Sequence, residues 1–258
     1  MKTTPMVSVI IPAYRCADTI CDTIDSVLIQ DVPMEILVID DCPEEPVEAA
    51  LEKYSQDLRL IYLKNEKNMG AAMTRNRAVT LAKAPYVAFL DSDDQWMPGK
   101  LKKQLQVLQD TDAVLCCTAR ELMTPQGQPT GKVIGVKELI TYRELFKFNC
   151  INCSSVVIKT EVAREFPMTH EASHEDYIMW LKVLRKYGEA RGLDEPLIRY
   201  RLSNTGKSGS KLKSAWMTFT AYRHAGLSLG RSLLNFCSYA FYGTTKYLFP
   251  KKRTNYDT

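Results

Sequence analysis

The sequence predicts an α/β fold with a mostly parallel sheet flanked by helices. Short apolar runs alternate along the chain with longer segments whose apolar residues recur at helical spacing, which is typical of βαβ units. The runs are apolar throughout, as expected of strands that are buried on both faces. Several of them end in carboxylates, and open α/β sheets bind ligands at the carboxyl ends of their strands.

The predicted strands are apolar runs bounded by turn residues or acids. They are residues 7–11, 35–39, 58–63, 86–90, 113–117, 154–159 and 197–202. Helices are predicted between them, at residues 18–28, 44–56, 71–83, 99–109, 136–148 and 175–184. Asp18 has the side chain of an N-cap for the first helix. The turn-rich residues 124–131 predict a mobile loop.

An acidic cluster follows the predicted strand 86–90. Asp91, Asp93 and Asp94 fall within four residues and repel one another unless a cation neutralises them. Carboxylate oxygens favour Mg²⁺ or Mn²⁺, which bind through one or two carboxylates and substrate phosphates. Right-handed crossovers would bring Asp40 and Asp41 to the same rim. The alternative is a solvated turn in which Asp94 caps the next helix.

Two further groups of charged residues lie near predicted helix starts. Glu175 and Asp176 open the helix at 175–184, either as catalytic acids or because the helix dipole favours acids there. Arg75 lies close to the start of the helix at 71–83. Lys207 lies in a Gly- and Ser-rich segment that either closes over phosphates or is a solvated linker.

The composition is that of an ordinary folded protein, with 258 residues, 45% hydrophobic and 25% charged. No signal-peptide pattern occurs at the start, so secretion is not expected. The eight cysteines mostly lie in apolar runs, and the single Cys150-x-x-Cys153 pair lacks a second pair or a nearby His at zinc spacing. A reducing, cytoplasmic location is therefore predicted.

The net charge of +4 is unevenly distributed. Residues 199–258 carry eleven Lys or Arg and one acid, so anionic lipid, a diphosphate substrate and nucleic acid are the partners considered. Residues 211–258 are predicted to form a helical, aromatic-rich, basic extension. It either lies in a membrane interface or packs on the preceding domain, and no apolar run is long enough for a transmembrane span.

Five stretches, taken in order, resemble the inverting family 2 glycosyltransferases of the GT-A fold. They are VSVIIPAY (7–14), EILVIDDC (35–42), NMGAAMTRNRA (68–78), FLDSDDQW (89–96) and HEDYIMWL (174–181). Together they span roughly residues 5–205. The region downstream, with Tyr200 and Arg201, is similar to members that build bacterial surface polysaccharides. The chain departs from the family where members often read DDGS and it has Asp40-Asp41-Cys42-Pro43.

The resemblance implies a role for each matching residue. Asp176 corresponds to the general base, next to Glu175, and Asp93 is the expected direct metal ligand, together with Asp91 of the D-x-D motif. Asp40 and Asp41 would receive the uracil and the ribose. The implied nucleotide-sugar contacts are Pro12, Ala13, Tyr14, Asp40, Asp41, Gly70, Arg75, Asp91, Ser92 and Lys207.

We therefore expect a GT-A catalytic domain at residues 1–210 and a membrane-associating extension at 211–258. The expected reaction is inverting transfer of a hexose from a UDP-sugar to a lipid-linked or growing cell-surface glycan, with Mn²⁺ or Mg²⁺ assisting the leaving group and an Asp as base. The enzyme would be peripheral on the inner face of the cell membrane and bind no nucleic acid. The alternatives are a sugar-1-phosphate nucleotidyltransferase and a non-catalytic module that binds nucleotide sugars.

Overall fold

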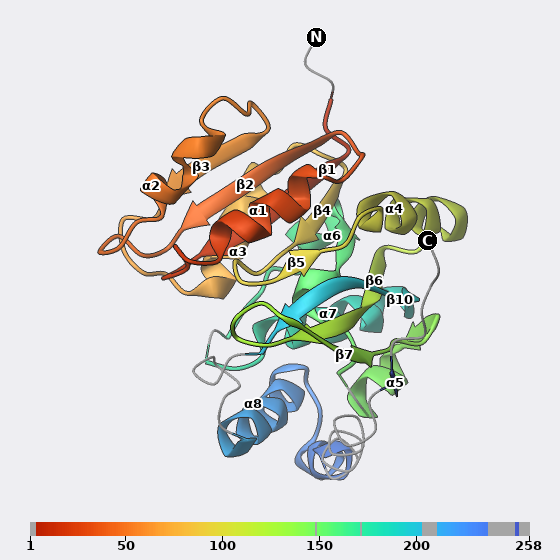
Figure 1. Cartoon of the computed structure of the whole chain (residues 1–258). Helices are drawn as coiled ribbons and strands as arrows, with labels where there is room; N and C mark the ends of the chain where they lie inside the picture. Colours follow the sequence, from red (N-terminus) through yellow and green to blue (C-terminus); the bar gives the residue numbers. More distant parts are fainter. Residues whose placement is uncertain (1–3, 148, 171, 203–210, 237–250, 253–258) are drawn as a thin grey trace.

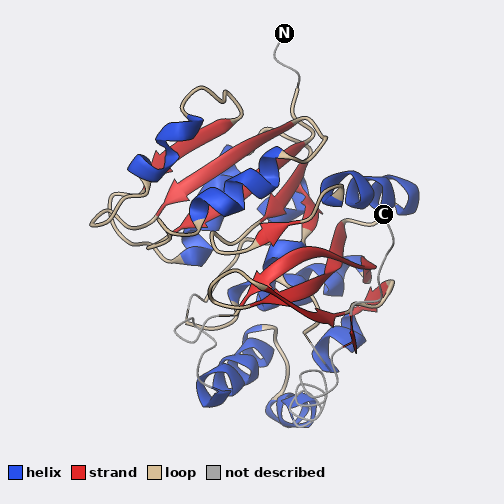
Figure 2. Cartoon of the chain, in the orientation of Figure 1, coloured by secondary structure: helices blue, strands red, loops and turns tan. Residues whose placement is uncertain are grey.

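One twisted sheet runs through the molecule, and helices pack on both of its faces (Figures 1 and 2). The computed structural model describes residues 4–147, 149–170, 172–202, 211–236 and 251–252. Within these residues, eleven strands form a sheet in the order β11-β7-β6-β9-β4-β1-β2-β3, and β10 pairs with β5, β6 and β8. The predicted α/β class is confirmed.

The strands are β1 (Val7–Ala13), β2 (Met34–Asp40), β3 (Leu60–Lys64), β4 (Tyr86–Phe89), β5 (Gln95–Trp96), β6 (Leu115–Met123), β7 (Pro129–Ile134), β8 (Leu139–Thr141), β9 (Val157–Lys159), β10 (Glu189–Arg201) and β11 (Lys251–Lys252). The helices are α1 (Ile20–Leu28), α2 (Glu48–Leu51), α3 (Ala71–Leu81), α4 (Lys100–Thr111), α5 (Tyr142–Lys147), α6 (Thr160–Glu165), α7 (Glu175–Tyr187) and α8 (Lys211–His224), with the 3₁₀ turns η1 (Glu52–Tyr54) and η2 (Cys153–Ser155).

Side chains of the central strands alternate between two apolar layers. On β1, Ile10 belongs to the layer that contains α3, α6 and α7, whereas Val9 and Ile11 belong to the layer that contains α1 and α4. Both layers are buried, which explains why these strands are continuous apolar runs in the sequence.

Strand directions bring several carboxyl ends to one edge of the sheet. β3, β2, β1 and β4 are adjacent in the sheet and run parallel to one another. β9 is antiparallel to both β4 and β6, so β6 runs in the same direction as β4, and β10 runs parallel to β6. The segments after β2, β4, β6 and β10 therefore emerge at the same edge.

Several local predictions were wrong. The helix predicted at 136–148 is β8 followed by the short α5, because β8 pairs with β10, as in Ile140↔Ala190. The loop predicted at 124–131 includes the start of β7, after a hairpin turn whose Gly127 has a φ of +83°. The helix predicted at 44–56 is reduced to α2 and η1. Thr19, not Asp18, is the N-cap residue of α1.

The helix α8 packs on the preceding residues through one face. Tyr222 is fully buried, its ring lies 5.6 Å from that of Phe146, and its hydroxyl donates a hydrogen bond of 2.7 Å to the Phe146 carbonyl. Part of the predicted extension is thus continuous with the core of the preceding residues. A search of the described residues found no helix with the length and apolar character required to span a membrane.

Lys100 is fully buried at the start of α4. Its Nζ lies 4.1 Å from the ring centroid of Trp96 and donates a hydrogen bond of 2.7 Å to Oε1 of Gln104. Burial lowers the pKa of Lys100 to about 7. An unfolded lysine titrates near pH 10.4, so folding releases a proton over much of the range between these two values.

We expect Lys100→Met to remove this proton release. Between about pH 8 and pH 10 the unfolded wild-type chain binds the extra proton, so wild-type stability should rise relative to the variant by about 1 kcal/mol per pH unit. Urea unfolding of both proteins at several pH values measures this difference. A difference in unfolding free energy that does not change with pH would contradict the lowered pKa.

Candidate active site

A cavity of about 830 Å³ opens at the carboxyl ends of the parallel strands. This volume is in the range of sites for small ligands. The residues that line it come from β1, the loops after β1, β2, β3, β4 and β6, the start of α3 and the end of β10. They are Pro12, Ala13, Tyr14, Arg15, Cys16, Thr19, Asp41, Asn68, Gly70, Ala71, Arg75, Asp91, Ser92, Asp93, Pro125, Arg201 and Leu202.

The acidic loop after β4 is fixed to α1 by two threonines. Thr19 Oγ1 donates to the Ser92 carbonyl at 2.8 Å, and Thr23 Oγ1 contacts the carbonyls of Ser92 and Asp94 at 3.0 and 2.8 Å. These bonds satisfy backbone carbonyls of the loop on the side that faces α1. The side chains of Asp91 and Asp93 are left at the cavity.

Asp94 serves a different purpose from its two acidic neighbours. It is buried, and its carboxylate accepts hydrogen bonds from Ser154 Oγ at 2.6 Å and from the Arg201 amide at 2.8 Å. Burial and the charges of Asp93 and Asp91 raise its pKa well above the usual value. The alternative prediction, in which Asp94 caps the next helix, is wrong, because Gly99 is the N-cap residue of α4.

Arg201 joins the acidic loop to the β6–β7 hairpin. Its Nε donates to the Asp93 carbonyl at 2.8 Å, and its Nη1 donates to the Pro125 carbonyl at 2.9 Å. A Cβ on Gly127 would lie 3.0 Å from Nη1, so this turn approaches the guanidinium closely. The sequence patterns do not predict Arg201 as a site residue, because its position depends on β10 ending at the same edge of the sheet as β4.

Asp93 has no cation within ion-pairing distance among the described residues. Burial and the neighbouring charge of Asp91 raise the pKa of its carboxyl to about 6. A partly buried carboxylate next to a second one is the electrostatic setting that a bound cation relieves.

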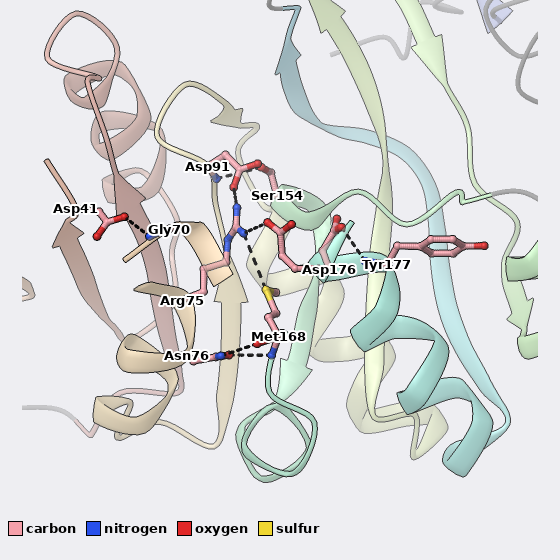
Figure 3. Close-up of polar contacts among 10 residues, drawn as sticks. Asp41, Gly70, Arg75, Asn76, Asp91, Ser154, Met168, Asp176 and Tyr177 are labelled. Carbon is pink, nitrogen blue, oxygen red and sulfur yellow. Dashed lines mark hydrogen bonds and ion pairs between the residues drawn. The ribbon is translucent and has the colours of Figure 1, made fainter. Parts of the chain in front are cut away.

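Arg75 bridges the acidic loop to the start of α7 (Figure 3). Its Nη2 lies 2.5 Å from Asp91 Oδ1, and its Nη1 lies 3.1 Å from Glu175 Oε1. The side chains of Arg75 and Glu175 are 7% and 9% exposed, so this ion pair is almost entirely removed from water. The guanidinium thus neutralises carboxylates from two elements that are far apart in the sequence.

Asp176 follows Glu175 in the first turn of α7. One oxygen of its carboxylate accepts a hydrogen bond of 2.7 Å from the Tyr177 amide (Figure 3). Burial and the charge of Glu175 raise its pKa to about 6, while His174 and Arg75 act in the opposite direction. Glu175 and Asp176 do not line the cavity, and Arg75 is the residue that connects them to it.

Asn76 fixes the segment that leads into α7. Its Nδ2 donates to the Met168 carbonyl at 2.7 Å, and its Oδ1 accepts from the Met168 amide at 2.9 Å (Figure 3). Neighbouring residues of α3 therefore hold both the acidic first turn of α7, through Arg75, and the chain before it.

Asp40 and Asp41 differ in position although they are adjacent. Asp41 lines the cavity, and its carboxylate accepts from the Gly70 amide at 2.8 Å and from Asn65 Nδ2 at 2.7 Å. Gly70 has a φ of +83° and precedes α3, a conformation that favours glycine. Asp40 is buried behind the rim, where it accepts hydrogen bonds from the Cys42 and Val47 amides and from the Tyr62 hydroxyl.

The cavity therefore brings together most of the predicted nucleotide contacts. Those that line it are Pro12, Ala13, Tyr14, Asp41, Gly70, Arg75, Asp91 and Ser92, and the predicted metal ligand Asp93 lines it as well. Asp40 does not line it, because protein groups engage its carboxylate. Lys207 lies outside the described residues. Within the described part of the chain, no three His, Cys, Asp or Glu side chains are grouped to hold a metal by themselves.

A twisted α/β sheet whose parallel strands end in a carboxylate-lined cavity is typical of the GT-A fold of nucleotide-sugar enzymes. The family model "Glycosyl transferase family 2" matches residues 8–164. The chain belongs to this family and is a glycosyltransferase. The expectation from the five sequence stretches is confirmed, and the nucleotidyltransferase and non-catalytic alternatives are not supported.

Two relatives cover most of the chain. A putative teichuronic acid biosynthesis glycosyltransferase, TuaG of Bacillus subtilis, is 38% identical over 223 residues, which are 85% of this chain and 88% of TuaG. The Escherichia coli UDP-Glc:alpha-D-GlcNAc-diphosphoundecaprenol beta-1,3-glucosyltransferase WfaP is 31% identical over 95% of this chain and 96% of WfaP. The chain is thus related to glycosyltransferases of bacterial surface polysaccharide biosynthesis.

Two solved structures share the fold. Staphylococcus aureus TarS 1-349 in complex with UDP-GlcNAc matches with a TM-score of 0.70 and 19% identity, over 91% of this chain and 71% of TarS 1-349. The Pyrobaculum calidifontis mannosyltransferase PcManGT in complex with GDP-Man and Mn²⁺ matches with a TM-score of 0.69 and 17% identity, over 95% and 71% of the two chains. At this identity the likeness supports the fold alone.

We expect Arg75→Met to destabilise the protein by about 3 kcal/mol, because it removes the guanidinium that neutralises the neighbouring carboxylates of Asp91 and Glu175. Adding Glu175→Gln should restore part of this loss by removing one of the charges. Urea unfolding at neutral pH measures both effects. If the single and double variants were equally stable, the Glu175 carboxylate would not depend on Arg75.

Proposed function

We propose that the protein is an inverting hexosyltransferase that uses a UDP-sugar and a lipid-linked or growing cell-surface glycan. The observation that carries the proposal is the Arg75 bridge, since it joins Asp91 at the cavity to the turn that holds Asp176. Such a reaction requires two parts. One is a carboxylate-bearing loop at the site of the sugar donor, and the other is a separate carboxylate at the site of the acceptor hydroxyl.

In this proposal the donor occupies the cavity at the carboxyl ends of β1, β2 and β4. Pro12, Ala13 and Tyr14 would contact the nucleotide, and Asp41 would accept hydrogen bonds from its ribose or base. The Asp40 carboxylate would act indirectly, by holding the loop after β2 through its bonds to the Cys42 and Val47 amides. The UDP-Glc named for WfaP supports a UDP-linked donor.

The oxygen ligands that the acidic loop offers fit a divalent cation. Asp93 and Asp91 are hard oxygen ligands, the carboxylate of Asp93 forms no ion pair among the described residues, and both side chains line the cavity. These two residues would hold Mn²⁺ or Mg²⁺, which when bound supplies Lewis-acid neutralisation of the leaving diphosphate. Arg75 would keep Asp91 oriented, and the Thr19 and Thr23 hydroxyls would keep the loop backbone fixed.

Asp176 is the proposed general base. A carboxylate with a pKa near 6 is ionised at neutral pH, yet is more basic than an ordinary aspartate. It would accept the proton of the acceptor hydroxyl as that oxygen attacks the anomeric carbon and the bond to the nucleoside diphosphate breaks. Because attack and departure occur on opposite faces of the sugar, a single displacement inverts the anomeric centre.

The acceptor proposed is a glycan attached to a lipid through a diphosphate. WfaP, which covers nearly the whole chain, is named for transfer to GlcNAc-diphosphoundecaprenol, and TuaG is named for teichuronic acid biosynthesis. Such an acceptor would place the enzyme at the inner face of the cell membrane.

We expect Asp93→Ala and Asp176→Asn to lower sugar transfer by different routes. Losing the base should reduce kcat by about 10²- to 10⁴-fold while leaving Mn²⁺-dependent UDP binding intact. Asp93→Ala should weaken that binding as well, because a metal ligand is lost. Transfer assays with a UDP-sugar panel and membrane extract, together with UDP calorimetry with and without Mn²⁺, separate the two routes. Normal turnover by Asp176→Asn would rule out the base.

The rate should also depend on pH through Asp176. Because its pKa is raised to about 6, kcat/KM should fall about tenfold per pH unit below pH 6 as the carboxyl becomes protonated. The charge of Glu175 contributes to the raised pKa, so Glu175→Gln should move this limb of the profile to lower pH. A profile that is unchanged in Glu175→Gln would assign the limb to another group.

A further inference from the structure

Large apolar side chains are exposed on the C-terminal helices of the described chain. Trp216 on α8 is 66% exposed, and Leu229, Leu233 and Leu234 in the following helical segment, residues 229–236, are 59%, 51% and 75% exposed. Single exposed leucines are common on protein surfaces, but a contiguous group indicates an interaction site.

One surface, which we call the outer apolar face, is made by the exposed Trp216, Leu229 and Leu233 and the half-buried Phe219 and Phe236. The ring centroids of Trp216 and Phe219 are 5.9 Å apart, and those of Phe219 and Phe236 are 6.1 Å apart, so the rings connect the two helical segments. Leu229, Leu233 and Phe236 follow helical spacing and lie along one stripe.

The charge around this face has one sign. Arg223 and Arg231 are exposed on the same two segments. No Asp or Glu occurs in the sequence between Glu195 and Asp257. Aromatic and leucine side chains combined with Arg are typical of helices that lie in the interface of an anionic membrane.

The opposite face of α8 contacts the start of α7. Ser173 Oγ donates to the Met217 carbonyl at 2.8 Å, and the rings of Tyr177 and Tyr222 lie 6.1 Å apart. Ser173 and Tyr177 flank Asp176 in the sequence. Only α8, with a diameter of about 10 Å, therefore separates the outer apolar face from the turn that carries the proposed base.

We infer that the outer apolar face docks on the surface of an anionic lipid bilayer and thereby sets Asp176 at the height of a lipid-linked acceptor. The occupant is a bilayer and not a second copy of the chain, because a twofold contact would oppose the same basic segments with no acid between them. Docking itself is independent of the proposed function, whereas the link to acceptor height rests on it.

The test is flotation of the full chain with phosphatidylcholine vesicles that contain or lack phosphatidylglycerol, with no donor or acceptor present. Wild type should bind the anionic vesicles and release them as salt is raised. Trp216→Ser/Leu233→Ser should bind at least about tenfold more weakly. Leu58→Ser is the matched control, because Leu58 is 84% exposed just before β3, far from α8 (Figure 1), and it should bind like wild type.

Arg231→Gln provides a second variant that leaves the apolar side chains in place. It should weaken binding to anionic vesicles by about fivefold and leave binding to neutral vesicles unchanged. Failure of the wild type to bind, equal losses in the double variant and in Leu58→Ser, or dimerisation through this face in sedimentation without lipid would each overturn the inference.

A transfer assay then separates this inference from the proposed function. With a lipid-linked acceptor in vesicles, Trp216→Ser/Leu233→Ser should lose at least about tenfold in rate, but it should match wild type on a water-soluble short-chain acceptor. Vesicle binding without transfer to either acceptor would contradict the proposed function but would support docking through the outer apolar face. Equal loss on both acceptors would show that the face does not present the lipid-linked substrate.

Discussion

The ion pairs of Arg75 are the interaction on which the site depends. Its guanidinium contacts Asp91, which follows the central strand β4, and Glu175, which begins α7 and lies a hundred residues after Arg75 in the sequence. Two carboxylates brought this close in a buried place repel each other, and burying one guanidinium alone is costly. Each charge is therefore tolerated only because the others are present, which ties the donor side of the cavity to α7.

Uncharged contacts hold the same elements at fixed distances. Asn76 hydrogen-bonds both backbone groups of Met168, one residue along α3 from Arg75. On the other side of the cavity, the Asp94 carboxylate joins Ser154 Oγ to the Arg201 amide. These bonds keep Asp91 and Asp93 close together, so the repulsion between their carboxylates persists in the absence of a bound cation.

The sequence predicts the first half of the fold well and the second half poorly, for a physical reason. β1, β2 and β4 are buried on both faces and are therefore continuous apolar runs, which local patterns identify. β7 and β8 depend on pairing with β6 and β10, and local residues carry little of that information. The same reason explains the site: Asp91 and Asp93 follow a recognisable strand, whereas Arg201 reaches the cavity only through the pairing of β10 with β6.

Burial, together with the charges of neighbouring carboxylates, explains why two acids near the cavity have a pKa of about 6. Asp91, Asp93, Glu175 and Asp176 supply four carboxylates, and Arg75 is paired with only two of them. The remaining pair, Asp93 and Asp176, is partly buried and carries the raised values. A diphosphate entering this cavity would add more negative charge. In the proposed reaction a cation held by Asp93 would balance this charge, and Asp176, on the far side of Arg75, would remain available to accept a proton.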